Sequence, residues 1–291
     1  MLKRLAVAGA GVVLACTVAA CGGTGEQAGA GASPSTEWVG KTPSGGSTNP
    51  GKQLSSPTYQ TSPKPGSAVD WGDPFVVENF NAPLDDDWGV YDSPNGKPPR
   101  SSDMVAVADG MLQLSGGVSK KSGKDVGAGA AYYRDQKFGK WEVRFRVQAG
   151  AGYAPAVLLW PEDNADWPKN GEIDMMEVID PKRQGGGTYL HHGKNNEHVG
   201  VDYTKADFTR FHTVGVEWLP SRVTYYLDGK PYFNVTPDQM DTGLPDEGPM
   251  HLALQLDQGC GYPIPCRNAQ TPERVVMDVD WIKIWKYRGK S

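Results

Sequence analysis

Three carboxylates stand close together in one apolar run of the 291-residue chain. Glu172, Asp174 and Glu177 lie within six residues, between Gly171 and Val178. Three acids on one surface repel, so they should not all ionise near neutral pH. One glutamate can then stay protonated as a general acid while another acts as a carboxylate nucleophile, which is chemistry that cleaves a glycosidic bond. The alternatives are a solvated acidic edge or a calcium site.

The spacing of these acids sets a condition on the backbone. On a regular strand Glu172 and Asp174 point the same way, whereas Glu177 falls out of phase. A β-bulge at Met175-Met176 would restore the phase, and we expect that bulge, with the two methionines packed in the core. The glutamate Cα atoms would then lie about 13 Å apart, and inward-leaning carboxyls would reach the roughly 5 to 5.5 Å of a retaining glycosidase.

Short apolar runs separated by turns predict the elements that hold this segment. Asp109-Gly110 and Asp228-Gly229 each join two such runs, as in β-hairpins. The segments with hairpin or strand patterns include residues 104–114, 141–147, 223–235 and 276–287. No long stretch carries helical periodicity. About 220 residues of spaced strands predict an all-β fold, a β-sandwich jelly roll of two antiparallel sheets.

The composition disfavours several classes of protein. Gly (37) and Pro (23) are abundant and hydrophobic residues make up only 38%, which argues against a helical bundle or a membrane transporter. The formal net charge is -5, so the chain has no excess of Lys and Arg with which to neutralise phosphates. We therefore expect a turn-rich β fold without a nucleic-acid partner.

Residues 1–20 predict a lipoprotein signal peptide. Lys3 and Arg4 precede a 16-residue run without charge, and Val18-Ala19-Ala20-Cys21 is similar to the lipobox of bacterial lipoproteins. We expect Cys21 to be acylated after cleavage and to anchor the chain to a bacterial cell membrane on its extracytoplasmic side. The alternative is an ordinary signal peptide and a secreted protein.

The rest of the chain divides into a tether and one domain. From residue 22 to residue 67, 30 of 46 residues are Gly, Ser, Thr or Pro, which predicts that residues 21–70 are a disordered tether. Residues 71–291 form the predicted catalytic domain. Cys260 and Cys266 lie close together in it, and outside the cytoplasm we expect them to form a disulfide.

The order of motifs resembles glycoside hydrolase family 16, the laminarinase-type β-glucanases. The three acids match its E-x-D-x-x-E signature, and Trp167-Pro168 precedes them in the W-P-x-x-G-E-I-D context of the family. Further segments that resemble family strands are residues 78–88, 138–144, 211–218, 225–229 and 279–281. The resemblance thus extends over nearly the whole predicted domain.

The resemblance implies a concave substrate cleft across one sheet. It also implies endo-acting hydrolysis of a β-linked polysaccharide with retention of configuration. By position, Glu172 is the nucleophile, Glu177 is the general acid/base, and Asp174 helps to set their protonation. No cofactor is implied, although a structural calcium ion is compatible with the family, and we expect a monomer.

Aromatic side chains are candidates for sugar binding, because sugar rings present apolar faces. Trp167 matches a sugar-stacking position of the family, and Trp160 and Tyr133 are further candidates. For Trp141 and Trp281, which stand in alternating strand patterns, we expect a place in the core.

The histidines predict no zinc site. His191 matches a family strand on which a histidine lies near the catalytic aspartate. Its neighbour His192 should point to the opposite face of a regular strand, so the two cannot share a metal. We expect His212 and His251 to be structural.

Two segments depart from the family pattern. The usual tryptophan after P-A-x is Leu158 here, and the N-x-A-V-G-G segment reads QLDQGC at residues 255–260. Both segments shape the cleft walls in the family. The substrate therefore stays open between β-1,3-glucan, β-1,3-1,4-glucan, a galactan and a bacterial exopolysaccharide. Transglycosylation and non-catalytic glycan binding in the cell envelope are alternative functions.

Overall fold

The computed structural model describes residues 69–289. The predicted signal peptide, Cys21 and the predicted tether up to residue 68 lie outside the described residues. Within the described part the fold is all-β, and its helical segments are three single turns, η1 (Ser102–Met104), η2 (Asn164–Asp166) and η3 (Pro237–Gln239). Two antiparallel sheets pack face to face, which confirms the predicted fold class.

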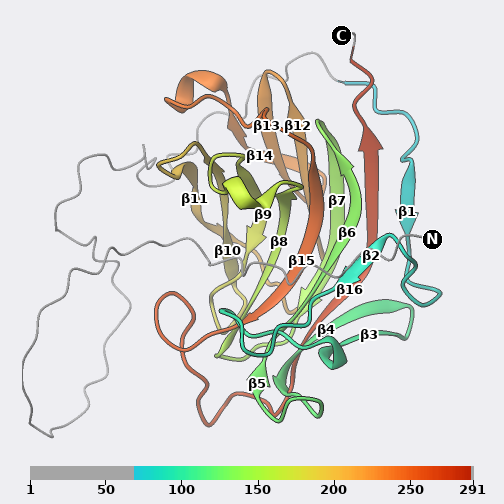
Figure 1. The fold of residues 1–291 in the computed structure, drawn as a ribbon, viewed down its shortest axis with the longest axis vertical. Coiled ribbons are helices and arrows are strands. Elements are labelled where there is room, and N and C mark those ends of the chain that lie inside the picture. The colour runs from blue at the N-terminus through green and yellow to red at the C-terminus, as the bar shows by residue number, and fades with distance from the viewer. Residues whose placement is uncertain (1–68, 290–291) are drawn as a thin grey trace, which may run out of the picture.

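One sheet has nine strands, and the first and last strands of the described chain lie side by side in it (Figure 1). Its main path runs in the order β14 (Lys230–Val235), β13 (Arg222–Leu227), β12 (His212–Leu219), β7 (Gly139–Val147), β16 (Val275–Lys286), β4 (Met111–Val118) and β3 (Val105–Ala108). In addition, β1 (Val76–Glu78) pairs with β16, and β5 (Asp125–Val126) pairs with β4.

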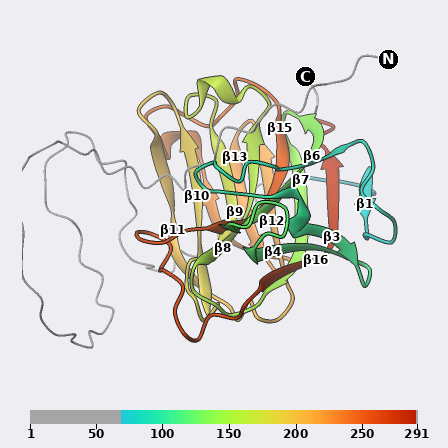
Figure 2. The ribbon, with the colours of Figure 1, turned by 60° about the horizontal axis from the view of Figure 1, so that its bottom comes forward.

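The other sheet has seven strands and carries the segment with the three acids. Its order is β11 (Glu197–Lys205), β10 (Gly185–His192), β9 (Glu172–Glu177), β8 (Tyr153–Pro161), β15 (Met250–Gln258), β6 (Ala128–Gln136) and β2 (Trp88–Val90). In Figure 2, β11 and β10 lie on one side of the molecule and β1 on the other. In this strand order β9, which carries the three acids, is an inner strand with β8 on one side and β10 on the other.

Alternating side chains of both sheets form the core between them. On β7, Trp141, Val143, Phe145 and Val147 are buried, while the residues between them are only partly so. The two predicted hairpins are present as β3–β4 and β13–β14. In the first of them Asp109 and Gly110 have φ angles of 55° and 70°, the left-handed conformation that a two-residue hairpin turn requires.

The expectation that Trp281 lies in the core is wrong. Trp281 is on the outer side of β16, where the Lys283 ammonium lies 4.4 Å from the centre of its ring. Ile282 and Ile284 fill the core instead. The pairing of β16 with β7 shifts between Val279 and Trp281, so one extra residue reverses the phase of the strand.

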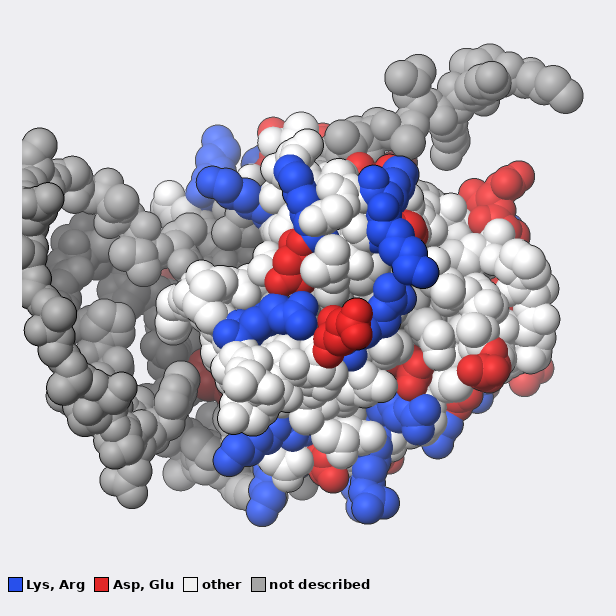
Figure 3. All heavy atoms as spheres, turned by 90° about the horizontal axis from the view of Figure 1, so that it is seen from below, with Lys and Arg blue, Asp and Glu red and all other residues white. Residues whose placement is uncertain are grey.

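Several further features of the described surface complete the fold. The predicted disulfide joins Cys260 to Cys266 in the segment between β15 and β16. Lys and Arg side chains are spread over the face in Figure 3, with Asp and Glu among them. No helix in residues 69–289 has the length and apolar character to cross a bilayer.

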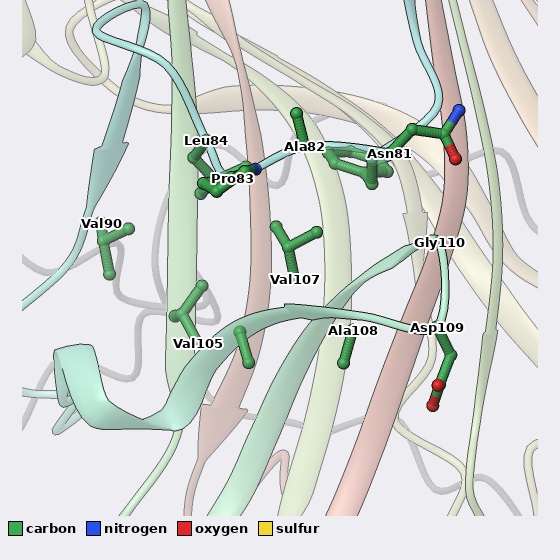
Figure 4. Close-up of a pocket in the computed structure, with 12 residues that line it drawn as sticks. Asn81, Ala82, Pro83, Leu84, Val90, Val105, Val107, Ala108, Asp109 and Gly110 are labelled. Atoms are coloured by element: carbon green, nitrogen blue, oxygen red, sulfur yellow. The ribbon is translucent and has the colours of Figure 1, made fainter.

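A mostly apolar cavity of about 440 Å³ lies between residues 80–84, Val90 and β3, and none of the predicted site residues lines it (Figure 4).

Candidate active site

The backbone of β9 contains the bulge that the spacing of the acids predicts. Val157 and Leu158 are successive residues of β8, but their partners on β9 are Met176 and Asp174. Met175 is therefore the extra residue, and the pairing of β9 with β10 shifts at the same place. The bulge returns the third acid of the signature to the face that carries the first two.

Thr188 of β10 satisfies the backbone at this bulge. Its hydroxyl Oγ1 donates a hydrogen bond of 2.7 Å to the carbonyl oxygen of Met175. The hydroxyl of Tyr232 lies 2.7 Å from the same Oγ1. A bulged residue leaves the ladder, and an unpaired buried carbonyl would be costly. Thr188 is fully buried. Its hydrogen bond to Met175 therefore stabilises the irregular backbone on which the position of the acids depends.

The acids lie on the face of the seven-stranded sheet that turns away from the core. Ile173, Met175 and Met176 fill the core between the sheets, as expected for the two methionines. The opposite side has its own apolar cluster, formed by Ala156, Leu158, Trp160 and Ala253 with Trp167 packed against them. We call this outer surface of β6, β8, β9, β10 and β15 the acid face.

Glu172 is the acid with the most hydrogen-bond donors. The indole Nε1 of Trp167 donates to its Oε2 at 2.9 Å, and the carboxyl of Asp174 is hydrogen-bonded to it as well. Burial and the charge of Glu177 raise the pKa of Glu172 to about 8, against the lowering effect of these two hydrogen bonds. The hydrogen bonds favour the ionised form of Glu172 over the ionised forms of its neighbours.

Asp174 and Glu177 also favour their protonated forms. Burial and the charge of Glu172 raise the pKa of Asp174 well above its ordinary value. Burial, then the charges of Asp174 and Asp257, raise the pKa of Glu177 well above its ordinary value. Three neighbouring acids thus share protons, as expected for carboxyls that cannot all ionise together.

His191 lies beside the central aspartate. Its Nε2 is 3.5 Å from Asp174 Oδ2, and its Nδ1 is 3.0 Å from the side-chain oxygen of Asn196. Burial, and then the stacked ring of His198, lower the pKa of His191 to about 4, so the ring is neutral at pH 7. His192 contacts other groups: its Nδ1 is 3.0 Å from the Gly243 carbonyl and its Nε2 is 2.9 Å from Glu247.

The aromatic candidates form a row beside the acids. Trp160 and Trp167 stack with their ring centres 5.7 Å apart. Tyr133 lies on β6, further from the acids, and 46% of its surface is exposed. Its ring packs edge-on against the ring of His251, and the two ring centres are 5.0 Å apart. On the neighbouring strand, His251 pairs with Trp160. The structure thus brings Trp160, Trp167 and His191 to the acids, and it connects Tyr133 to them through His251.

Four further residues of this region were not among the predicted site residues. His251, expected to be structural, is one of them. The others are Arg100, Gln255 and Asp257, which form a buried polar network on the same face. Gln255 and Asp257 belong to the segment that departs from the family pattern, but Arg100 is more than 150 residues away from both in the chain, so no local pattern could connect it to them. Among residues 69–289, no group of three or more His, Cys, Asp or Glu side chains is arranged to hold a metal ion.

A sandwich with aligned carboxylates and stacked tryptophans on one outer face has the architecture of a β-jelly-roll glycoside hydrolase. Residues 102–283 match the sequence profile of glycosyl hydrolases family 16, and the chain belongs to that family.

Known proteins similar to this chain agree with the family and the fold. The glucan endo-1,3-beta-glucosidase A1 of Niallia circulans is 25% identical over 229 residues, which cover 68% of this chain and 33% of that protein. The beta-glucanase of Rhodothermus marinus is 26% identical over 167 residues, which cover 52% of this chain and 58% of that protein. The chain thus matches only part of the length of either relative.

The fold has close counterparts among solved structures. The laminarinase catalytic domain of Thermotoga maritima MSB8 aligns with a TM-score of 0.66 and 23% identity, over 75% of this chain and 99% of that one. The endo-β-1,3-glucanase of Pyrococcus furiosus aligns with a TM-score of 0.64 and 20% identity, over 75% of this chain and 95% of that one. These alignments confirm the jelly-roll fold.

Proposed function

We propose that this chain is a retaining endo-glycoside hydrolase that cleaves a β-linked glucan. The observation that carries the proposal is the common face of Glu172, Asp174 and Glu177, restored by the bulge at Met175, with the Trp167 indole donating to Glu172 at 2.9 Å. Two neighbouring carboxyls in different protonation states are what a double displacement needs.

Glu172 is the proposed nucleophile and Glu177 the proposed general acid/base. Hydrogen bonds from Trp167 and Asp174 stabilise the carboxylate form of Glu172, which must attack the sugar. Glu177 is kept protonated by burial and by neighbouring negative charge, which suits a group that must first donate a proton. The two environments therefore separate the roles of two glutamates on one strand.

The reaction proceeds in two displacements. The Glu172 carboxylate attacks the anomeric carbon while Glu177 protonates the leaving glycosidic oxygen, which gives a covalent glycosyl-enzyme. Glu177, now ionised, takes a proton from a water molecule as the water oxygen attacks the anomeric carbon, which breaks the bond to Glu172 and releases it as a carboxylate. Two inversions at the anomeric carbon leave the β configuration unchanged.

Asp174 and His191 support this exchange of protons. Asp174 lies between the glutamates in sequence, is almost fully buried and is hydrogen-bonded to Glu172. The neutral ring of His191, fixed by Asn196, borders Asp174 without adding a positive charge. A neutral ring, unlike a cation, does not lower the pKa of the neighbouring acids.

The stacked Trp160 and Trp167 rings provide an apolar surface for a sugar next to Glu172. Tyr133 is proposed to contact a more distant sugar, because it is exposed and lies on the same face. A row of ring contacts beside the acids favours binding within a chain rather than at its end. This supports endo-acting cleavage.

We infer a β-1,3- or β-1,3-1,4-glucan as the substrate, since the names of the relatives specify glucanases. The test is the release of reducing ends from a panel of laminarin, mixed-linkage β-glucan, agarose and a bacterial exopolysaccharide, with the native protein and Glu172→Gln. We expect cleavage of a glucan and at least a ~10³-fold loss in the variant. Acceptor-dependent longer products would instead indicate a transglycosylase, and binding without cleavage by the native protein would indicate a lectin.

We further propose that the protein is exported and tethered to the membrane through a lipid on Cys21. The cationic start, the uncharged run and the lipobox-like residues 18–21 support this proposal. A Gly/Ser/Thr/Pro-rich tether of about 45 residues has a root-mean-square span on the order of 40 Å. It would let the domain reach polysaccharide beyond the membrane surface.

A further inference from the structure

A charged network lies buried on the acid face next to the three acids. Arg100 donates through Nε to Asp257 Oδ1 at 2.8 Å and through Nη2 to Gln255 Oε1 at 2.9 Å. Its guanidinium also lies 5.3 Å from the centre of the Tyr91 ring. Arg100, Gln255 and Asp257 are at most 2% exposed. A buried charge pair is costly to assemble, so its presence on this face requires an explanation.

Asp257 uses only half of its hydrogen-bonding capacity within this network. Arg100 occupies Oδ1, while Oδ2 is buried and has no hydrogen-bond partner in the part of the chain that the structure describes. A simple structural ion pair would be expected to satisfy both oxygens of a buried carboxylate. The two oxygens of a carboxylate share its negative charge, so Oδ2 carries part of that charge without a hydrogen bond from its own network.

The register of the sheet places this charge diagonally across β8 from Glu177. Ala156 of β8 pairs with Glu177 on one side and with Gln255 on the other. Asp257 pairs with Ala154, two residues further along the same strand. Alternate residues of a strand share a face, so these side chains all lie on the acid face. The β8 side chains between Glu177 and Asp257 are therefore the methyl groups of two alanines.

We propose that Asp257 is a positioning residue for the reaction: fixed by Arg100, it supplies the negative charge that keeps Glu177 protonated and ready to donate. This inference rests on the proposed function of Glu177. A carboxylate near an acid disfavours ionisation of that acid. The direction agrees with the structure, in which Asp257 contributes, after burial and Asp174, to the raised pKa of Glu177.

The other groups around Glu177 come from its own strand, from β10 and from β8. On its own strand, Asp174 and Glu172 are the neighbouring acids. On β10, Gly187 is the strand partner of Glu177. The Tyr189 hydroxyl lies over this glycine, 2.5 Å from the position that a Cβ atom would take there. The residues of β8 that face this region are alanines. Asp257 is thus the acid that acts on Glu177 from outside β9.

Asp257 must be ionised to act in this way. Burial raises the pKa of Asp257, and the charge and hydrogen bonds of Arg100 oppose that shift. The Arg100 guanidinium therefore keeps the buried Asp257 carboxylate ionised. It explains why an arginine, and not a neutral donor, holds the carboxylate.

The test compares the pH dependence of kcat/KM on a cleaved glucan for the native protein and Asp257→Asn. The alkaline midpoint reports deprotonation of the general acid. Removal of the negative charge should lower that midpoint by about 1 pH unit, the order expected of one nearby charge. If Asp257→Asn does not fold, Arg100→Met with Asp257→Leu removes the pair without leaving a lone charge, and the same downward shift is expected.

Asp278 provides a matched control on the other sheet. It is also buried, and it accepts hydrogen bonds from Arg146 at 2.9 Å and from Gln113 at 3.1 Å. Asp278→Asn therefore removes a buried carboxylate that is also paired with an arginine, away from the acid face. It should change stability and leave the alkaline midpoint at the native value.

A second readout separates this proposal from the proposed function. The carbonyl stretch of protonated Glu177, identified as the infrared band lost in Glu177→Gln, can be titrated without any substrate. Its midpoint should fall in Asp257→Asn even if no glycan tested is cleaved, in which case only the proposed function fails. An unchanged midpoint in Asp257→Asn or in the double variant overturns the role of Asp257.

Discussion

The side chain of Thr188 donates a 2.7 Å hydrogen bond to the backbone carbonyl of Met175, the extra residue in the middle of β9. This contact joins two strands at the point where the ladder is interrupted. Without the extra residue, Glu177 would point into the core. The relationship between Thr188 and Met175 therefore supports the whole arrangement of acids on one face.

Thr188→Val should test this support. Valine has the shape of threonine but cannot donate, so the Met175 carbonyl loses its 2.7 Å partner. We expect a loss of about 1–3 kcal/mol in the free energy of unfolding, measured by denaturant titration, together with a lower kcat. Thr224→Val removes a comparable buried hydroxyl from β13 and should leave kcat unchanged. Native kcat in Thr188→Val would contradict the account of the bulge.

Trp167→Phe should alter the acidic limb of the pH profile. The Trp167 indole stabilises the ionised form of Glu172, so its loss should raise the pKa of that carboxyl. The acidic midpoint of kcat/KM should move to higher pH by about 0.5–1 unit. Trp160→Phe, which perturbs the same stacked pair but removes no donor to Glu172, should weaken binding without moving that midpoint. Equal effects of the two substitutions would refute the role of the indole.

Glu177→Gln should stabilise the folded protein, increasingly so at higher pH. Burial raises the pKa of Glu177, so the folded state holds its proton more tightly than the unfolded state does. Stability of the native protein therefore falls as the pH rises above about 4.3, the value for an unfolded glutamate, toward the raised folded value. We expect the variant to melt on the order of 3 °C higher at pH 8 and to differ less at pH 5.

Scanning fluorimetry at several pH values measures this difference, and the exposed Glu273→Gln serves as the control. The control should melt with the native protein throughout. If Glu177→Gln does not raise the melting temperature, or raises it more at pH 5 than at pH 8, the pKa of Glu177 is not raised in the folded protein.

Cys21→Ser should release the protein from the membrane. If Cys21 carries the lipid, the native protein expressed in a bacterial host will sediment with membranes and take up labelled palmitate, and the variant will do neither. Cys16→Ser, within the predicted signal peptide, is the matched control and should behave as the native protein. A soluble, unlabelled native protein would favour the ordinary signal peptide.

Local patterns were sufficient to predict the arrangement of β9. The phase of Glu172, Asp174 and Glu177 demanded one extra residue, and the bulge at Met175 supplies it. The Asp-Gly turns likewise predicted both hairpins, because few residue pairs adopt the required positive φ angles. The same reasoning failed at Trp281, where an extra residue in β16 had no comparable signal.

The remainder of the site depends on contacts between distant segments. Asp257 and His251 stand on β15, whose residues are buried on both faces, so no alternation shows which side chains share the acid face. Arg100, which donates to Asp257, stands 157 residues earlier in the chain. Only the register of the folded sheet brings Asp257 onto the same face as Glu177, two strands away.

The anomeric form of the first product is the most direct test of the central claim, that two glutamates on one face act as nucleophile and acid/base. Proton NMR recorded at the start of glucan cleavage, before mutarotation, distinguishes the two anomers. The account predicts the β-anomer first, with the α-anomer growing in later. An α-anomer at the first time point would contradict the double displacement at Glu172 and Glu177.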